Sequence, residues 1–361
     1  MKSRKLFKLG LFLSSLILTA LVLELGLRTY DLVRGYGFVR SNGSVSDQPI
    51  AFRGFGFDPY VVVDGRTMIS PRGGDERFSL EKPNGVYRIV CFGGSTTEQS
   101  VNGYHYPGLL QEALRERTNA NNVEVINVGW HAYSTAHSII LLALDVLSWN
   151  PDLIILSHNI NDLEVVYWPG FRLDYGNKYA HLFSSHKRCS ALDILWQYSR
   201  FYRFLYQRLK KIKLRTKNTS TIIRRSYGKI PPEQATGVFR RNLITFVSIA
   251  QSRGIKVILG TQPLEPSEDY FLRHMAYQLY NDIVIYPLHD EFVQHHAYYN
   301  SIIREVADKM GAGLVDNEHI FGGNREYFID FVHYTEKGIR KLAVNYADAI
   351  IGKYLPITGS S

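Results

Sequence analysis

The chain has 361 residues, 45% of them hydrophobic, which suits one large core or two small ones and excludes an obvious multidomain array. A net charge of +9 would suit a nucleic-acid-binding protein, but the basic excess falls between Ile194 and Pro232, where no acidic residue occurs. Two cysteines, Cys91 and Cys189, are too few for a disulfide framework, and the apolar run around Cys91 predicts a buried thiol.

A basic stretch followed by an apolar run opens the chain. Four of the residues 1–8 are basic, and residues 9–27 hold a single charge, Glu24. A run of this length can span a bilayer, whereas a cleaved signal peptide usually has a shorter apolar core and a small-residue cleavage site. We predict a transmembrane signal anchor over 9–27 and a cytoplasmic tail over 1–8. Because only Arg28 and Arg34 follow closely, the rest of the chain is expected on the extracytoplasmic side, periplasmic or extracellular.

The next segment, residues 28–85, is rich in glycine and arginine, with one strand-like piece at 60–65, and predicts a stalk that then packs on the main domain. From Tyr87 onward, short apolar runs alternate with helical patterns. The apolar runs are 87–94, 123–129, 151–162, 255–263 and 312–316. The helical patterns are 104–117, 136–150, 237–254, 298–311 and 335–355. This alternation predicts a parallel sheet covered by helices on both faces, in a domain over 86–355.

The domain carries a basic helical insertion at about residues 165–235. Within it, residues 195–217 predict a helix, because apolar side chains recur at steps of three and four. These side chains are Leu195, Tyr198, Tyr202, Leu205, Leu209 and Ile212. The basic residues between them have no acidic residue nearby in the sequence. Since nucleic acid is rare outside the membrane, we expect an anionic membrane surface or an acidic glycan as the partner. Ordinary packing of the apolar stripe is the alternative.

Loops at the carboxyl ends of the predicted strands are the expected place for a site, because parallel α/β sheets bind ligands there. Four such loops occur: residues 93–97, 127–133, 158–162 and 261–263. We expect them to converge on one cleft.

The first of these loops, "GGSTTEQ", joins a strand to a helix start. A phosphate loop would need a lysine before the hydroxyl residue, and a dinucleotide fingerprint would need three spaced glycines. An ordinary helix cap by Thr96 or Thr97 and a nucleophile at Ser95 both remain open. Near the C-terminus, Asp330 and His333 lie three residues apart before the last helix. A nucleophilic serine needs such a base, and the base needs a carboxylate to fix its tautomer.

Four segments together make the chain resemble the SGNH hydrolase superfamily, also called GDSL esterases. They are "FGGSTTE", "INVGWHAYS", "LSHNIND" and "DFVHYTEKG", and they occur in the family's order between residues about 90 and 340. The resemblance implies a three-layer α/β/α sandwich with a five-stranded parallel sheet of the flavodoxin-like kind, here preceded by one transmembrane helix. It implies no metal and no organic cofactor.

The same resemblance implies a set of site residues. Ser95 would be the nucleophile, His333 the base and Asp330 the residue that orients the base. The oxyanion hole would comprise the backbone N–H groups of Ser95 and Gly129 and the side-chain amide of Asn161, which is the usual machinery for a tetrahedral acyl intermediate.

The chain departs from the family pattern at three positions. Gly94 stands where the name-giving motif has aspartate, Ala132 where the second block often has glycine, and Asn159 where the third block usually has glycine. Because asparagine tolerates positive φ, we expect Asn159 to preserve the turn. Position 94 is not one of the catalytic positions. The missing carboxylate therefore makes the match to the family motif weaker but removes no group that the mechanism needs.

Other polar residues have weaker claims to a function. Trp130 and His131 are candidates for the substrate pocket, with packing of their loop as the alternative. Residues 289–296, "HDEFVQHH", hold acids and histidines at helical spacing, so a metal site and a solvated helix or flap are both open. His158, at a strand end, is expected to be a hydrogen-bonded core residue.

Three functions are compatible with these features. The sequence favours a membrane-anchored serine esterase acting on O-acyl groups of a polysaccharide or lipid, with acetyl groups on cell-surface or secreted polysaccharide as the leading substrate. The same residues would serve an O-acetyltransferase if a glycan hydroxyl replaced water as the acceptor. A catalytically idle domain that binds glycan or organises an envelope assembly is the third, which the filled catalytic positions disfavour.

Overall fold

The computed structural model describes residues 2–33, 59–71, 76–168, 170–179, 199–202, 204–205, 208, 222–275, 279–280 and 283–355. By its internal contacts the chain divides into two units, which are described separately below. The first comprises residues 1–50 and 181–220, and the second comprises residues 51–180 and 221–361.

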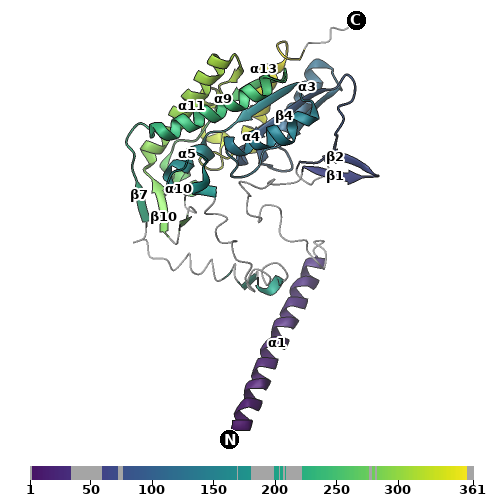
Figure 1. Cartoon of the computed structure of the whole chain (residues 1–361), viewed down its shortest axis with the longest axis vertical. Helices are drawn as coiled ribbons and strands as arrows, with labels where there is room; N and C mark the ends of the chain where they lie inside the picture. Colours follow the sequence, from purple (N-terminus) through teal and green to yellow (C-terminus); the bar gives the residue numbers. More distant parts are fainter. Residues whose placement is uncertain are drawn as a thin grey trace. The chain divides into compact units, whose positions relative to one another are not determined.

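The first unit contains one long apolar helix, α1 (Lys2–Val33) (Figure 1). Its stretch Gly10–Tyr30 is long and apolar enough to cross a membrane, by length and composition alone. Glu24 pairs with Arg28 at 2.8 Å and accepts hydrogen bonds from the backbone N–H groups of Arg200 and Phe201. The single charge of the predicted span therefore has partners within its own unit.

The predicted helix at 195–217 is described in part. Residues 200–202, 204–205 and 208 are helical. Apart from Ser199, which is not helical, the rest of that stretch, including Leu195, Tyr198, Leu209 and Ile212, lies outside the described residues, as does Cys189.

The second unit is built on a five-stranded parallel sheet, which confirms the predicted sheet. Its strands are β4 (Tyr87–Gly93), β5 (Val123–Asn127), β6 (Leu153–Ser157), β8 (Lys256–Gly260) and β11 (Gly313–Val315). They lie in the order β11-β8-β6-β4-β5, and every neighbouring pair is parallel. From β4 the chain adds β5 on one side, and it then adds β6, β8 and β11 on the other side. The carboxyl ends of β4 and β6 therefore form the topological switch point of the sheet.

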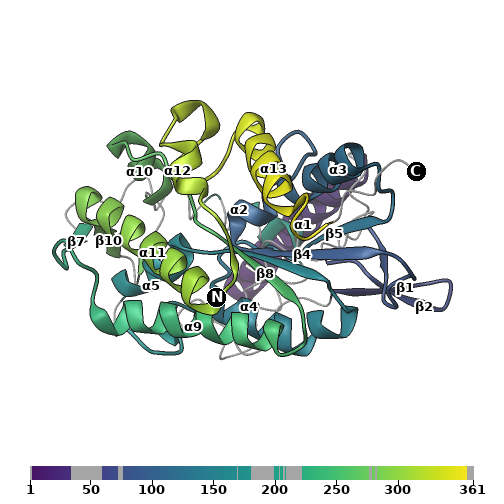
Figure 2. The ribbon, with the colours of Figure 1, turned by 90° about the horizontal axis from the view of Figure 1, so that it is seen from above.

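Helices cover both faces of this sheet, which confirms the three-layer arrangement (Figure 2). One face packs against α3 (Tyr106–Thr118) and α13 (Glu336–Ile350). The other packs against α4 (Thr135–Leu144), α9 (Glu233–Gln251) and α11 (His289–Met310). The short apolar strands are buried on both sides, as parallel strands between helical layers must be. Cys91 is fully buried as predicted, and burial raises the pKa of its thiol to about 12.

Residues ahead of the sheet fold onto its amino-terminal edge. Strands β1 (Tyr60–Val63), β2 (Arg66–Ile69) and β3 (Phe78–Ser79) form a small antiparallel sheet. The fully buried Arg88 donates to the carbonyl oxygens of Ser79 and Trp149 and pairs with Glu124 at 2.9 Å. This arginine therefore ties β3 to the main sheet.

Several elements have no counterpart in the sequence prediction. A second small sheet joins β7 (Ile222–Arg225), β10 (Ile283–Pro287) and β9 (Leu279–Tyr280). The short elements α5 (Ile160–Tyr167), α10 (Glu268–Met275), α12 (Asn317–Phe321) and the 3-10 turn η4 (Arg325–Tyr327) were not predicted either. In contrast, the 3-10 turn η2 (Val146–Trp149) lies within the predicted helical pattern 136–150, and α2 (Ser95–Glu98) lies at the predicted helix start after the first strand.

Candidate active site

The four loops at the carboxyl ends of the strands converge, as predicted. The Trp130 N–H donates to the Gly93 carbonyl oxygen at 3.2 Å, which joins the loop after β5 to the end of β4. From the loop after β8, Gln262 donates to Thr96 Oγ1 at 3.2 Å and accepts from the Ile160 N–H at 2.8 Å. Gln262 thus links the loops after β4, β6 and β8.

Ser95, His333 and Asp330 form one hydrogen-bonded series at this edge. Ser95 Oγ lies 2.8 Å from His333 Nε2, and His333 Nδ1 lies 2.8 Å from Asp330 Oδ2. Asp330 Oδ1 also accepts the backbone N–H groups of Val332 and His333. Burial raises the pKa of Asp330, but hydrogen bonds from His333 and its charge lower it more, so the net pKa is well below the usual range. The carboxylate therefore stays ionised beside the imidazole.

Gln99 holds the histidine loop in place, a contact that the sequence analysis missed. Its side chain donates to the Tyr334 carbonyl oxygen at 2.7 Å and accepts from the Tyr334 N–H at 2.9 Å. Gln99 belongs to the same "GGSTTEQ" stretch as Ser95, so one short segment supplies the serine and fixes the backbone next to His333. Composition alone gives no signal for this pairing, because the residues lie 235 positions apart.

The predicted oxyanion donors differ in their surroundings. Ser95 opens α2, and no described residue accepts a hydrogen bond from its N–H. The Asn161 amide donates one hydrogen to the Tyr133 carbonyl oxygen at 2.8 Å and has a second N–H to offer. The Gly129 N–H, in contrast, donates to Asn127 Oδ1 at 2.9 Å and would have to give up this bond to reach a substrate.

Positive φ occurs in the second block rather than the third. Asn159 has φ of −161°, so the expectation that it preserves a left-handed turn is wrong. Its side chain donates instead to the His296 carbonyl oxygen and to Asn300 Oδ1, both on α11. Ala132 has φ of 59°, at the position where the family often has glycine. No described residue accepts a hydrogen bond from the Ala132 N–H.

Gly94 leaves room for the Asn161 side chain. A Cβ built on Gly94 would overlap Asn161 Nδ2. The departure from aspartate at this position therefore has a structural consequence, because any side chain at 94 would displace the Asn161 amide.

The two pocket candidates differ in exposure. Trp130 is buried and lies against the Tyr133 ring, 6.4 Å between centroids. His131 is half-buried, with its Nδ1 3.6 Å from Glu98 Oε2 on α2. His131 therefore lies beside the helix that Ser95 opens.

The remaining histidines named from the sequence lie within the fold. His158 is buried and bonds Ser138 Oγ at 2.7 Å, which confirms its prediction as a core residue. In residues 289–296, His295 bonds Tyr167 Oη at 2.7 Å and the Gly228 carbonyl oxygen at 2.8 Å, and His296 is fully buried. This segment is thus the partly buried start of α11. Of the predicted solvated helix, only Asp290 and Gln294 are exposed.

One cluster of the described residues has metal-ligand chemistry. His274, Asp330 and His333 offer ligand atoms within 4.8 Å of one another. A cation there would compete with the hydrogen bond from His333 to Asp330, so the same atoms cannot serve both arrangements at once.

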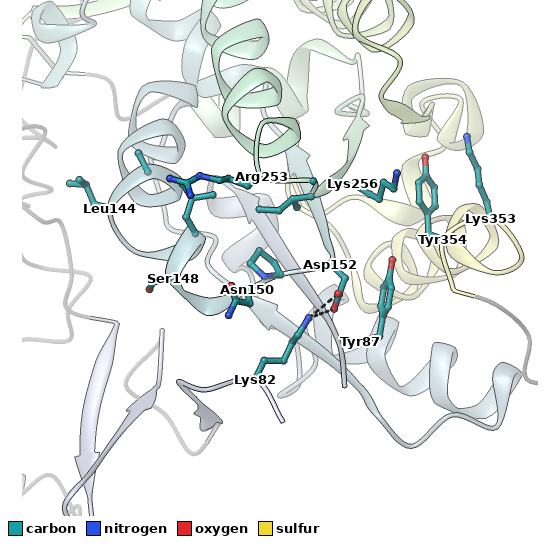
Figure 3. A pocket seen from close by; sticks show the side chains of 15 residues that line it. Lys82, Tyr87, Leu144, Ser148, Asn150, Asp152, Arg253, Lys256, Lys353 and Tyr354 are labelled. Atoms are coloured by element: carbon teal, nitrogen blue, oxygen red, sulfur yellow. Dashed lines mark hydrogen bonds and ion pairs between the residues drawn. The ribbon is translucent and has the colours of Figure 1, made fainter. Parts of the chain in front are cut away.

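A pocket of about 840 Å³ lies at the opposite end of the sheet (Figure 3). It is lined by residues from the amino ends of β4, β6 and β8, among them Tyr87, Asp152 and Lys256. Lys82 and Asp152 form an ion pair at 2.8 Å within it. The Ser95 series lies at the carboxyl ends of the strands, so this pocket is separate from it.

Comparison with known proteins identifies the family. The model of the GDSL-like lipase/acylhydrolase family matches residues 91–341, which is more than half of the chain. No curated protein matches. The chain belongs to the GDSL-like lipase/acylhydrolase family and is an ester-hydrolysing serine hydrolase.

Several solved structures are similar to this chain at low identity. A lipase/acylhydrolase from Enterococcus faecalis is 17% identical, with 76% of this chain and 100% of that chain covered and a TM-score of 0.45. A variant acetyl xylan esterase from Geobacillus stearothermophilus is 13% identical, covering 77% and 99%, with a TM-score of 0.44. The acetyl xylan esterase AlAXEase is 20% identical, covering 73% and 99%, with a TM-score of 0.39.

Proposed function

We propose that this chain is a membrane-anchored esterase whose domain faces the extracytoplasmic side and hydrolyses O-acyl esters through Ser95, His333 and Asp330. The observation that carries the proposal is the hydrogen-bonded series of these three side chains at the carboxyl end of β4.

Catalysis would proceed by acyl transfer to Ser95. His333 Nε2 takes the Ser95 Oγ proton as the oxygen adds to the ester carbonyl carbon, and Asp330 stabilises the imidazolium that forms. When the tetrahedral intermediate collapses, the alcohol leaves with the proton from His333. Water, deprotonated by His333, then attacks the acyl-enzyme. The carboxylic acid departs and Ser95 regains its proton.

The oxyanion would be held by the Ser95 N–H and the second N–H of the Asn161 amide. For the other backbone donor we favour the Ala132 N–H, because the Gly129 N–H already donates to Asn127. Ala132 lies in the same loop, and its carbonyl oxygen accepts a hydrogen bond from Tyr179 Oη at 2.6 Å, which holds the peptide unit that follows Ala132.

Acetyl groups on cell-surface or secreted polysaccharide are the substrate we propose. An anchor over 9–27 with the domain outside the membrane would hold Ser95 close to such polymers.

We further propose that the basic segment at 195–217 contacts anionic lipid or an acidic glycan. A fragment starting near residue 35 should bind anionic vesicles, and the binding should weaken as salt is raised. Vesicle binding that survives charge reversal at Lys210, Lys211 and Lys213 would contradict this assignment.

A fluorophosphonate probe tests the central proposal. The probe should label the wild-type chain and leave Ser95→Ala unlabelled, and a small activated acetyl ester should be hydrolysed only by the former. Equal labelling of both proteins would refute Ser95 as the nucleophile. Product analysis with a sugar alcohol present separates hydrolysis from acyl transfer, since transfer would give an acetylated sugar in place of free acetate.

A further inference from the structure

A third ionisable side chain lies behind the Asp330–His333 pair. His274 stands near the end of α10, with its ring centroid 5.6 Å from that of His333. Its Nδ1 lies 3.8 Å from Asp330 Oδ1, and its Nε2 lies 3.3 Å from Glu164 Oε1. Each ring nitrogen of His274 therefore faces a carboxylate, one of them the carboxylate that orients His333.

Glu164 is itself part of a buried ion pair. Its Oε2 lies 2.7 Å from Lys178 Nζ, and the two side chains are only 9% and 5% exposed. Burial raises the pKa of Glu164, but the charge of Lys178 and the hydrogen bond from His274 lower it to about 2. Glu164 therefore remains an ionised acceptor for His274 at any working pH.

The buried ion pair of Glu164 and Lys178 is not explained by a gain in stability alone. A buried ion pair loses the hydration of both charges, and apolar side chains of similar volume are often as stabilising. The position of the pair is informative, because Glu164 lies three residues after Asn161 on α5 and so shares its helical face. Lys178 Nζ also lies 3.4 Å from the Asn161 carbonyl oxygen. The pair thus adjoins the proposed oxyanion donor on one side and His274 on the other.

We propose that His274 is a positioning residue for the Asp330–His333 pair, and that Glu164 and Lys178 hold the His274 ring in place. This inference rests on the proposed function of Ser95, His333 and Asp330. The His274 ring, held by Glu164 and lying 3.8 Å from Asp330 Oδ1, limits the space in which the Asp330 carboxylate can rotate, and Asp330 in turn keeps His333 Nδ1 in line. Loss of His274 should slow every step that uses His333 as a base while leaving substrate binding nearly intact.

The experiment compares full-length variants by two readouts: the rate of labelling at Ser95 by a fluorophosphonate, and kcat and KM on a small acetyl ester. We expect His274→Ala to lose about 10- to 100-fold in labelling rate and in kcat, the range for removing a side chain that orients a functional group, with little change in KM. His274→Asn places an amide near the position of Nδ1 and should recover part of the loss. Glu164→Gln should also lower the labelling rate and kcat. Adding Glu164→Gln to His274→Ala should lower them little further, because the two residues act as one unit.

His289→Ala is the matched control. His289, on α11, packs against Phe271 of α10, the helix that carries His274, with 5.3 Å between ring centroids. It also bonds the Pro266 carbonyl oxygen at 2.6 Å. This variant therefore loosens α10 without removing a group that faces Asp330, and it should keep most of the labelling rate.

Two results would overturn the inference: a His274→Ala chain labelled as fast as wild type, or a His289→Ala chain slowed as much as His274→Ala. If His274→Ala does not fold, His274→Asn and Glu164→Gln decide the question by the same rates. A wild-type chain that is not labelled at Ser95 would instead refute the proposed function, and the positioning role with it. In both overturning results the wild-type chain is still labelled at Ser95, which distinguishes failure of this inference from failure of the proposed function.

Discussion

At the scale of single residues, the amide of Asn161 and the missing side chain of Gly94 are two parts of one feature. If the amide stabilises the oxyanion, Asn161→Ala should lower kcat by about 100- to 1000-fold, the usual loss for one such donor. Gly94→Ala should lower kcat in the same direction, because the new Cβ displaces Asn161 Nδ2. Steady-state kinetics on a small acetyl ester measure both effects.

A double variant separates this explanation from general damage to the loop. In the Asn161→Ala background there is no amide to displace, so adding Gly94→Ala should have little further effect on kcat. Gly94→Ala should lower the free energy of unfolding by about 1 to 3 kcal/mol, because the displaced Asn161 amide loses its buried hydrogen bond to the Tyr133 carbonyl oxygen. Losses that multiply in the double variant would mean that Gly94 acts independently of Asn161.

The second backbone donor can be tested by changing one atom. Replacing Ala132 with lactic acid exchanges its N–H for an ester oxygen and keeps the side chain. If the Ala132 N–H serves the oxyanion, kcat should fall by about 100-fold. The matched exchange of Gly129 for glycolic acid removes a bond to Asn127 and should change kcat less. The reverse order of the two effects would return the role to Gly129.

At the scale of elements, the regular part of the domain could be predicted from local patterns. The five strands of the parallel sheet and the helices α3, α9 and α13 occur where apolar runs and helical spacing place them. Local patterns suffice there because each strand is buried on both faces and each helix on one. Loop convergence followed from the rule that parallel strands end at the same edge.

Elements formed by distant pairings could not be predicted in this way. Strand β7 pairs with β10, more than 50 residues away, and neither segment alternates clearly enough to reveal its partner. The role of His274 depends on where α10 lies relative to Asp330, which no local pattern encodes. Asn159 shows a different limit, because its contacts with α11 override its tolerance of positive φ.

The helix α1 leads to a prediction about topology. If it is a retained anchor with the N-terminus inside, protease added to intact cells or spheroplasts should cut the large domain and spare a reporter fused before Lys2. The chain should also stay in the membrane fraction at high salt, because an apolar span of this length is held by the hydrocarbon core. Protection of the large domain would reverse the topology, and a shortened, soluble product would indicate a cleaved signal peptide.

At the scale of the whole molecule, buried histidines set the dependence of stability on pH. Burial lowers the pKa of His137, His158 and His296 to about 3. In the unfolded chain these groups bind protons below about pH 6.5, so folding excludes three protons and stability is lost as pH falls from 6.5 toward 3. Asp162 has the opposite effect, because burial raises its pKa to about 6. Between about pH 6 and pH 4 the folded protein binds one proton at Asp162 that the unfolded chain does not bind, which reduces the loss of stability by one proton.

From these four groups alone, the net difference of two protons predicts that the free energy of unfolding falls by about 3 kcal/mol per pH unit between pH 6 and 4.5. His296 allows a direct test, because it is fully buried and neither ring nitrogen has a described hydrogen-bond partner. His296→Leu removes one of the excluded protons, so from pH 7 to pH 5 this variant should lose about 2 kcal/mol less stability than wild type. Denaturant unfolding followed by tryptophan fluorescence measures the difference. If His296→Leu and wild type lose the same stability over this range, His296 does not exclude a proton on folding, and the acid sensitivity must come from other groups.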